Sequence, residues 1–569
     1  MTPPSRARTI IHIFAALFLL IGLQQAIERA WMPIGVPSLD AGDYLGQAWA
    51  YRQALEVWDL QAFFTAALTP NVHPPLHALL LGVVLAALGP EADLAAASAV
   101  ELLLFVGALG GLVAPARGID REWGLTVGLC AAAFVAWSTE HARLSSAPMT
   151  ENAALLATIV TLILAVRWDR RGTTFDALAT GVALTLAGLV RWNLGPMLLL
   201  PLLIAGHRDH RVTLHLLVVP TFATLVVWSA LRPELGEALR AFFTNVDSGV
   251  PLWTKENLLW LPTATSDAYH GPLGTGLVVL FSLVALRGRA GAPRALFAPG
   301  HRILLLTALV GAVALTVHPF KIHRAMHGLV ALLDLIAAFG ALAALSYLPA
   351  RLRPGATGIV LVLALAASLS QRSARMRLEM EESEERLKLL DDVVAASGQP
   401  GHVVISGHIR WFPATTVALW YRRAGWREVT IDTPVIEGCL AYTEPEPSCL
   451  PPATAAALNL PGAVFTTLAA DESERRTRQA QTDAGGKEPA RRRPADESER
   501  RALQAQTGGG DEEAARRRPM PAVRRQEEVG LDWSFPSAFQ VGAAASAAGF
   551  TTTRLENERP QGTIEVWKK

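Results

Sequence analysis

Apolar and polar positions divide the chain into two unlike parts. Over residues 1–371, long apolar runs alternate with short polar breaks, whereas residues 372–569 mix the two kinds of residue as water-soluble proteins do. A helix that crosses a bilayer needs about 20 mostly apolar residues. The pattern therefore predicts a mostly α polytopic membrane protein of about 11–13 transmembrane helices. The expected spans are 9–26, 74–89, 94–114, 122–138, 151–167, 176–192, 194–206, 212–231, 271–287, 302–318, 325–347 and 356–371.

The orientation of these spans follows from the places where cations gather. Cytoplasmic loops carry an excess of Lys and Arg, and such loops occur here at alternate turns: 167–171, 207–211, 287–302 and 351–353. The polar segments between them then face the outer side of the membrane: 27–73, 137–151, 231–271, 317–324 and everything after 371. This alternation gives the helices between 74 and 138 the wrong parity, so either one of them does not cross or the count is off by one.

The polar part of the chain predicts a stalk followed by a small domain. Residues 372–395 are charged and helical in spacing, and 396–569 is expected to be an extracytoplasmic α/β domain. Its predicted elements are a helix at 415–424 and strands at 402–406, 428–431, 463–468 and 563–567. Within it, Asp471–Arg476 recurs 25 residues later as Asp496–Arg501. The repeat is short of apolar residues, so 471–528 is predicted to be a disordered insertion.

Composition narrows the class of protein further. Of 569 residues, 51% are hydrophobic and 18% are charged, against about 25% charged residues in ordinary soluble domains. These values exclude a cytosolic enzyme, a fibrous protein and a disordered scaffold. The 51 Lys and Arg nearly balance the 50 Asp and Glu, so no basic field indicates a nucleic-acid partner. With only 3 Cys, a zinc cluster built from cysteines is excluded as well.

The first outer segment, 27–73, holds two carboxylates at the start of a predicted helix. Asp40 and Asp43 precede an apolar and aromatic stripe at helical spacing: Tyr44, Ala48, Tyr51, Leu55 and Trp58. Such a stripe predicts a helix that lies in the membrane interface. His73, Pro74 and Pro75 close the segment. An N-cap role for each Asp and a helix start for the prolines are the structural alternatives.

Together these residues resemble a known family. An acidic residue four positions before Tyr44, followed later by His73 and Pro-Pro-Leu, is similar to the first outer loop of the GT-C glycosyltransferases. The closer resemblance is to the bacterial protein-mannosyltransferase and aminoarabinose-transferase-like group, which use polyprenyl-phosphate sugars. It covers residues 1–350 or so and implies a GT-C-like fold with Asp40 at the catalytic centre, Asp43 as second candidate, and His73 where the aminoarabinose group often has Lys.

A second outer segment breaks the positive-inside rule. Residues 317–324 include Lys321, His323 and Arg324 on the side where cations are expected to be scarce. We interpret them, with His73, as ligands of the donor phosphate, and an anchor to lipid headgroups is the alternative. The resemblance supports this role for Arg324, which matches the Arg that opens a late helix in the family.

Further substrate-binding candidates lie at the outer ends of other spans. Tyr44, Glu140, Arg143, Glu151 and Arg191 form this set, and the family carries an acidic residue near Glu151. Helix capping is the alternative for the acidic residues, and outward snorkelling is the alternative for Arg191.

Two acidic residues, Glu101 and Asp334, fall inside predicted spans, where a charge is costly and usually has a partner. They are expected to be neutral or paired structural groups, and a proton or ion path is the alternative. No cofactor is required by the pattern, and a divalent metal ion at Asp40 and Asp43 stays open.

These features predict a membrane glycosyltransferase of the bacterial inner membrane. It would move a sugar from a polyprenyl-phosphate donor to a lipid, glycan or protein acceptor on the outer face. The lipid phosphate is already a good leaving group, so the chemistry needs a carboxylate base, cations for the departing phosphate, and positioning. A single base opposite that phosphate implies inversion at the anomeric carbon. The alternatives are a transporter or flippase and a cell-envelope polysaccharide polymerase or ligase, which the long outer loop 232–270 would suit.

Overall fold

The structure, a computed structural model, describes the chain as two compact units, residues 1–384 and 385–569. The described residues of the first unit are 6–31, 39–68, 74–89, 94–191, 194–205, 255–287, 300–317, 323–349, 351–352, 355–356 and 359. Those of the second unit are 387–398, 402–406, 414–426, 429–432, 452–460, 463–469, 545–558 and 561–568. The predicted insertion 471–528 lies outside the described residues.

Every regular element among the described residues of the first unit is a helix, because a helix satisfies its backbone groups within itself. In chain order its elements are α1 (Arg6–Trp31), α2 (Leu39–Glu56), α3 (Leu60–Leu68), α4 (Pro75–Leu88), α5 (Leu94–Gly111), α6 (Val113–Ile119), α7 (Gly124–Trp137), α8 (Thr139–Leu144), α9 (Thr150–Arg171), α10 (Thr174–Val190), α11 (Leu194–Ala205), α15 (Lys255–Ala264), the π-helix η3 (Thr265–His270), α16 (Gly271–Arg287), α17 (His301–Val317), the 3₁₀ turn η5 (His323–Met326) and α18 (His327–Ser346).

Among the described residues, 4 helical stretches are long and apolar enough to cross a membrane: Leu94–Ile119, Thr150–Arg171, Leu258–Leu286 and His323–Ser346. Shorter apolar helices are His12–Gln24, Pro75–Leu88, Gly124–Trp137, Thr174–Val190 and His301–Thr316. The prediction of a mostly α membrane protein is confirmed. The expected span 212–231 and nearly all of 356–371 lie outside the described residues.

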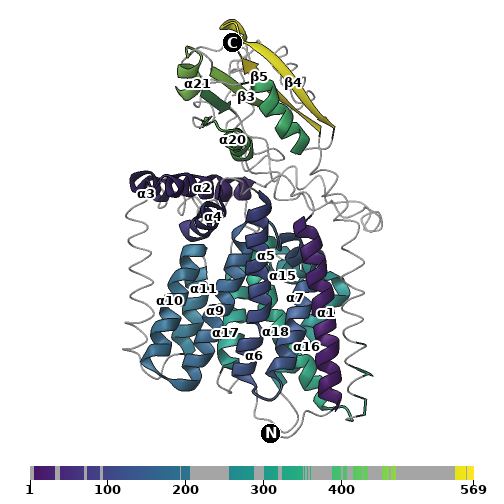
Figure 1. Ribbon diagram of the computed structural model, residues 1–569. Coiled ribbons are helices and arrows are strands. Elements are labelled where there is room, and N and C mark those ends of the chain that lie inside the picture. Colours follow the sequence, from purple (N-terminus) through teal and green to yellow (C-terminus); the bar gives the residue numbers. More distant parts are fainter. Residues whose placement is uncertain are drawn as a thin grey trace, which may run out of the picture. The chain divides into compact units, whose positions relative to one another are not determined.

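Helix α4 accounts for the wrong parity between 74 and 138. Figure 1 shows α2, α3 and α4 together at one end of the long helices. A Cβ atom on Gly82 of α4 would lie 2.7 Å from the carbonyl oxygen of Ala48 in α2, so glycine is what allows the two helices to approach so closely. The expected span 74–89 is thus a short helix at that end, beside α2 and α3, and not one of the long helices of the bundle. With α4 left out, residues 120–123 and 167–173 lie at the same end of the bundle.

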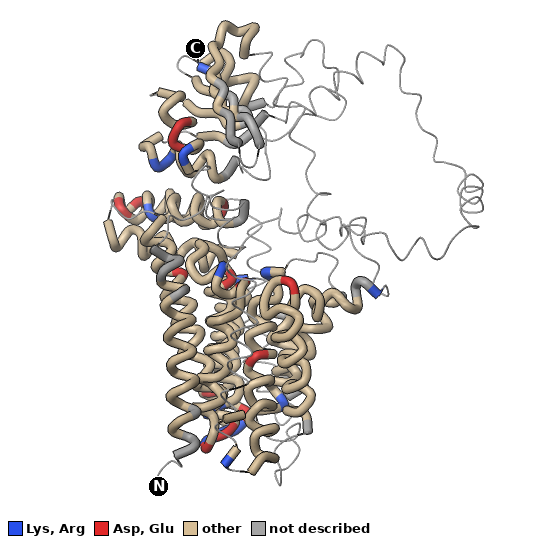
Figure 2. Tube along the Cα trace, turned by 90° about the vertical axis from the view of Figure 1, so that its right-hand side faces the viewer, with Lys and Arg blue, Asp and Glu red and all other residues tan. Residues whose placement is uncertain are grey.

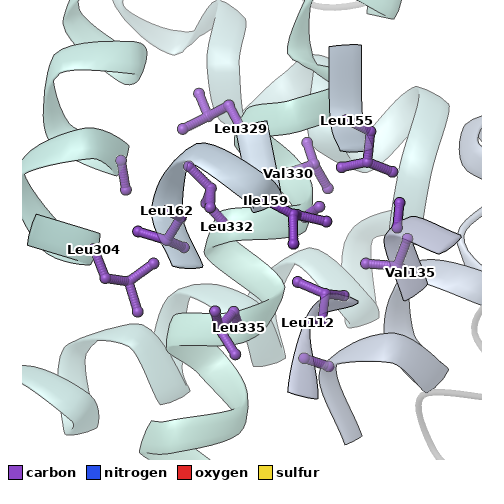
Figure 3. Packing of buried hydrophobic residues seen from close by; sticks show 14 of the residues in the cluster. Leu112, Val135, Leu155, Ile159, Leu162, Leu304, Leu329, Val330, Leu332 and Leu335 are labelled. Carbon is purple, nitrogen blue, oxygen red and sulfur yellow. The ribbon is translucent and has the colours of Figure 1, made fainter. Parts of the chain in front are cut away.

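One large apolar core joins the long helices. Figure 3 shows side chains from α7, α9, α17 and α18 meeting around it, among them Ile159, Leu304 and Leu335. Alanine and glycine let the helices come close: a Cβ atom on Gly340 of α18 would overlap the backbone of Phe281 in α16. Close packing of small residues is the usual way in which helices associate inside a membrane.

Charged side chains gather at the two ends of the bundle, as Figure 2 shows. One end, where α9 ends and α10 begins, holds the cation-rich loop predicted at 167–171. There Asp169 accepts a hydrogen bond from the backbone nitrogen of Gly300 at 2.7 Å and a second from Arg302. Arg167 pairs with Asp176 at 2.5 Å. We call this the α9–α10 end, and the opposite end the α2–α4 end.

The second unit is a small α/β domain with a five-stranded sheet of order β2-β1-β3-β5-β4. Its strands are β1 (His402–Ser406), β2 (Val429–Asp432), β3 (Ala463–Ala469), β4 (Thr551–Glu558) and β5 (Gln561–Lys568). Strand β1 is parallel to β2 and β3, whereas β5 is antiparallel to β3 and β4. The predicted α/β class is confirmed, but the sequence pattern does not predict β4.

Helices cover this sheet and bring a tyrosine hydroxyl into its core. They are α20 (Ala414–Arg423), α21 (Pro452–Ala457) and a helix at 387–397. This last helix overlaps the end of the stalk predicted at 372–395. Tyr421 of α20 is buried, and its hydroxyl bonds Ser397 at 2.8 Å and Thr466 of β3. The helix at 387–397 thus belongs to the packed domain in its described part.

Candidate active site

The first predicted element of the site, helix α2, is held against α4 and α9. Asp40 lies in its first turn and Asp43 directly follows that turn. Asp43 is half-buried, and the side chain of Asp40 lies outside the described part of the structure. Tyr44 is buried, and its hydroxyl lies 3.4 Å from that of Thr150, at the start of α9. Its ring meets the edge of His77 in α4, with 5.1 Å between centroids. The sequence thus places its two carboxylates on a helix whose position is fixed by α4 and α9.

Glu151 is the centre of a charged cluster at the α2–α4 end. It lies in the first turn of α9, and only 2% of its surface is exposed. Arg191 caps the end of α10, and its Nη1 lies 3.3 Å from Oε1 of Glu151. Nε of Arg324, in η5, lies 3.9 Å from the same oxygen. Two guanidinium groups thus lie beside one carboxylate, and guanidinium N–H groups are the donors that best bind an anionic ligand such as a phosphate.

Glu140 and Arg143 are paired with each other within α8. Arg143 donates two hydrogen bonds to the carboxylate of Glu140, at 2.8 and 2.6 Å. This fork-to-fork geometry is the strong form of an ion pair. Arg143 is therefore balanced within its own turn, in contrast to the pair of arginines at Glu151.

Buried aromatic side chains brace the chain that carries Arg324. Nε2 of His141 lies 3.0 Å from the carbonyl oxygen of His327, and its Nδ1 lies 2.9 Å from the hydroxyl of Ser138. A carbonyl only accepts, so Nε2 carries the proton. Burial, with His327 nearby, holds the pKa of His141 well below its usual value, so the ring is neutral. Tyr269 donates to the carbonyl oxygen of His323 at 2.8 Å, which holds η5 from a second side.

An apolar groove opens beside this cluster. It is partly open to the surroundings. Its walls come from α9, α11, α17 and α18, with Leu198, Gly311 and Leu332 among the apolar linings. Arg191 and His327 also line it, and Arg191 is the residue that the cluster and the groove share. The groove therefore suits an apolar chain with an anionic head.

A buried polar network lies between α2 and the cluster. Nε2 of His77 donates to Glu101 at 2.6 Å, and both side chains are fully buried. Asn152, next to Glu151, donates to the other oxygen of Glu101 at 3.1 Å. Glu101 is thus a paired group within the bundle, as expected. Asp334 likewise lies 3.0 Å from Nε2 of His270.

Several of the predicted phosphate ligands are not part of the observed cluster. His73 and Lys321 lie outside the described residues, and His323 is exposed. Within the part of the chain that the structure describes, no group of three His, Cys, Asp or Glu side chains could hold a metal ion. The structure brings together Glu151, Arg191 and Arg324, at one end of the groove.

Sequence reasoning missed three buried histidines at this end, His77, His141 and His327. His77 and His327 lie at or near the start of apolar helices, and His141 lies in the short polar helix α8. A lone histidine there usually fills a structural role, so the sequence offers little signal. Only the helices around them reveal their partners.

Comparison with solved structures gives the fold. The crystal structure of ArnT from Cupriavidus metallidurans bound to undecaprenyl phosphate superposes with a TM-score of 0.53, at 14% identity, over 83% of this chain and 94% of that one. Its apo form gives 0.54 at 16% identity, with the same coverage. The archaeal oligosaccharyltransferase AglB from Archaeoglobus fulgidus, in complex with an inhibitory peptide and a dolichol-phosphate, gives 0.50 at 8% identity, over 82% of this chain and 71% of that one.

No protein-family model matches this chain, and no curated protein matches it in sequence. At identities this low, structural similarity is evidence for the fold alone. The fold predicted from the resemblance, a GT-C-like membrane domain, is confirmed.

Proposed function

We propose that this protein is a membrane glycosyltransferase that moves a sugar from a polyprenyl-phosphate donor to a lipid, glycan or protein acceptor. The observation that carries the proposal is the cluster at Glu151, where Arg191 and Arg324 meet one carboxylate at the end of an apolar groove. An amphipathic donor needs both parts, cations for its phosphate and apolar walls for its tail. The likeness to ArnT with undecaprenyl phosphate and to AglB with a dolichol-phosphate supports this class of ligand.

In the proposed reaction, a carboxylate of α2 takes the proton of the acceptor hydroxyl as that oxygen attacks the anomeric carbon. Asp40 is the proposed base, with Asp43 as the second candidate. The bond from the sugar to the phosphate breaks, and the electron pair leaves with the lipid phosphate. Arg191 and Arg324 stabilise the charge that develops there. Attack from the side opposite the leaving group inverts the anomeric carbon.

The setting of the reaction is part of the proposal. The loops rich in Lys and Arg are predicted to face the cytoplasm, so the α2–α4 end is proposed to face the outer side of a bacterial inner membrane. The α/β unit is proposed to be extracytoplasmic. Helices α2 to α4, together at that end, would lie at the membrane surface where a lipid-linked donor and a polar acceptor meet.

The test is transfer of labelled sugar from polyprenyl-phosphate donors by the purified full-length chain in membranes. Asp40→Asn should abolish transfer while donor binding persists, because the amide cannot accept the proton. Asp59→Asn is the matched control: Asp59 is exposed and accepts from the backbone of Ala62 at the start of α3, and Asn caps a helix about as well. Transfer that survives in both Asp40→Asn and Asp43→Asn would overturn the assignment of the base.

The rival functions give different readouts in the same membranes. A transporter or flippase would move the labelled lipid or solute across the membrane without changing its covalent structure. Mass analysis of the lipid after incubation separates the two outcomes. A donor that is recovered intact on the opposite leaflet would reject the transferase and favour the transporter.

A further inference from the structure

His327 is a buried histidine whose two ring nitrogens, Nδ1 and Nε2, lack hydrogen-bond partners among the described residues. Only 2% of the residue is exposed. A buried polar group without a partner costs free energy and calls for an explanation, such as a ligand that completes it. Because the ring also lines the apolar groove, that ligand can come from the groove.

The surroundings of His327 fix the ring in place. Its own carbonyl oxygen accepts the hydrogen bond from Nε2 of His141. The two imidazoles lie against each other, with 4.0 Å between ring centroids and 37° between planes. The residue is therefore oriented before any ligand binds, which lowers the entropic cost of binding.

The charges around His327 define the ligand. Arg191 lines the same groove, and Arg324 lies three residues before His327 in the turn that leads into α18. Both guanidinium groups only donate, so a ligand between them must accept hydrogen bonds and carry negative charge. The rest of the lining is mostly apolar, and the hydroxyls of its two threonines, Thr158 and Thr307, bond to carbonyl oxygens of their own helices. An anionic head on an apolar chain, such as a lipid phosphate, meets both conditions, whereas free phosphate meets only the first.

We propose that His327 donates a hydrogen bond from its ring to the phosphate of the lipid donor and is a third ligand beside Arg191 and Arg324. This inference rests on the proposed function and adds a residue to it. A neutral imidazole always carries one N–H, so the role needs no change of protonation. The ring would contact the leaving phosphate, and its hydrogen bond would strengthen as charge develops there.

The test measures binding of three probes to the purified full-length chain in nanodiscs: a polyprenyl phosphate, the uncharged polyprenol of equal length, and inorganic phosphate. Wild type should prefer the phosphorylated lipid over both others. His327→Ala should weaken binding of polyprenyl phosphate roughly ten-fold or more, the usual effect of losing a hydrogen bond to a charged group. Binding of polyprenol should be unchanged.

Two conservative variants identify the nitrogen. His327→Asn offers an amide close to the position of Nδ1, and His327→Gln offers one close to Nε2. Restored preference for the phosphate in one of them assigns the donor atom and excludes a merely structural role. The control is His301→Asn, since His301 begins α17 beside Gly300 at the α9–α10 end. Thermal unfolding of each variant shows that it is folded.

The outcomes separate this inference from the proposed function. If His327→Ala binds polyprenyl phosphate as wild type does, or loses both lipids equally, the inference is overturned while the proposed function stands. If wild type itself does not distinguish polyprenyl phosphate from polyprenol, the proposed function fails first. Tight binding of inorganic phosphate without any gain from the lipid chain would also overturn the inference, because the groove would then play no part.

Discussion

The two ends of the helical bundle use the same kinds of residue in opposite ways. At the α9–α10 end, Asp169 accepts from Gly300 and Arg302, so its charge is matched by its neighbours. At the α2–α4 end, Oε1 of Glu151 lies within ion-pair distance of two arginines. Its second oxygen, Oε2, has no hydrogen-bond partner among the described residues. A carboxylate whose two oxygens are both paired stabilises the fold, whereas a buried carboxylate oxygen without a partner, beside a groove, is a place where a ligand can complete the hydrogen bonding.

The largest expected effect distinguishes the arginines of the two ends. Arg191→Gln should lower the transfer rate roughly 100-fold, the usual cost of removing one group that stabilises developing charge. Arg302→Gln should leave the rate unchanged and lower the unfolding temperature, since it removes a partner of the buried Asp169. Transfer kinetics and thermal unfolding of both variants test the contrast. An equal loss of transfer rate in both variants would contradict the different roles assigned to the two ends.

The next effect concerns the groove. Gly311 lines it, and a Cβ atom there would lie 3.3 Å from Leu329 Cδ1 and Met197 Cε. Gly311→Leu should fill the space and raise the KM for a long-chain donor on the order of ten-fold, since each excluded CH₂ costs about 0.8 kcal/mol. Gly276→Leu is the control, because Gly276 on α16 has open space around its Cβ position. A short-chain water-soluble donor should show no change with either variant.

An effect of similar size should follow from moving α2 without touching its carboxylates. Gly82→Ala would place its Cβ 2.7 Å from Ala48 and Tyr51 of α2. Overpacking of this kind costs about 1–3 kcal/mol, and a shift of the helix that bears Asp40 should lower kcat roughly ten-fold. Gly110→Ala is the matched control, since Gly110 has nothing within 4 Å of its Cβ position. A normal kcat in Gly82→Ala would mean that α2 does not position the base.

The sequence predicts the charged members of the site better than its uncharged ones. Glu151, Arg191 and Arg324 stand out because a charge beside an apolar run is costly and calls for a reason. His327 does not stand out, because its lack of a partner depends on α9, α11 and α17, which are distant in the chain. The contacts between these helices come from packing, which local spacing does not encode.

In the α/β unit too, elements with a clear local pattern are predicted, and an element set by its packing partner is not. Strands β1 and β3 are predicted because their apolar runs are buried on both faces, as in parallel sheets. Strand β4 has the sequence TTTRLENE and little apolar alternation. Its strand conformation depends on pairing with β5 over its whole length. Edge strands of this kind are set by the partner, and the residue pattern alone does not predict them.

The smallest expected effect sharpens the contrast with a third polar cluster, the hydroxyls around Tyr421. Here every hydroxyl has a partner, and burial raises the pKa of Tyr421 to about 12. Tyr421→Phe should therefore lower the stability of the α/β unit by only about 1 kcal/mol, with no change in transfer. The advantage of Tyr over Phe should be complete below pH of about 10, the ordinary pKa of an unfolded tyrosine. It should shrink as pH rises towards 12, because the unfolded chain loses its proton first. Hydrogen exchange of β1 and β3 amides in the full-length chain measures this difference, and a gap that widens with pH would contradict a buried, neutral hydroxyl.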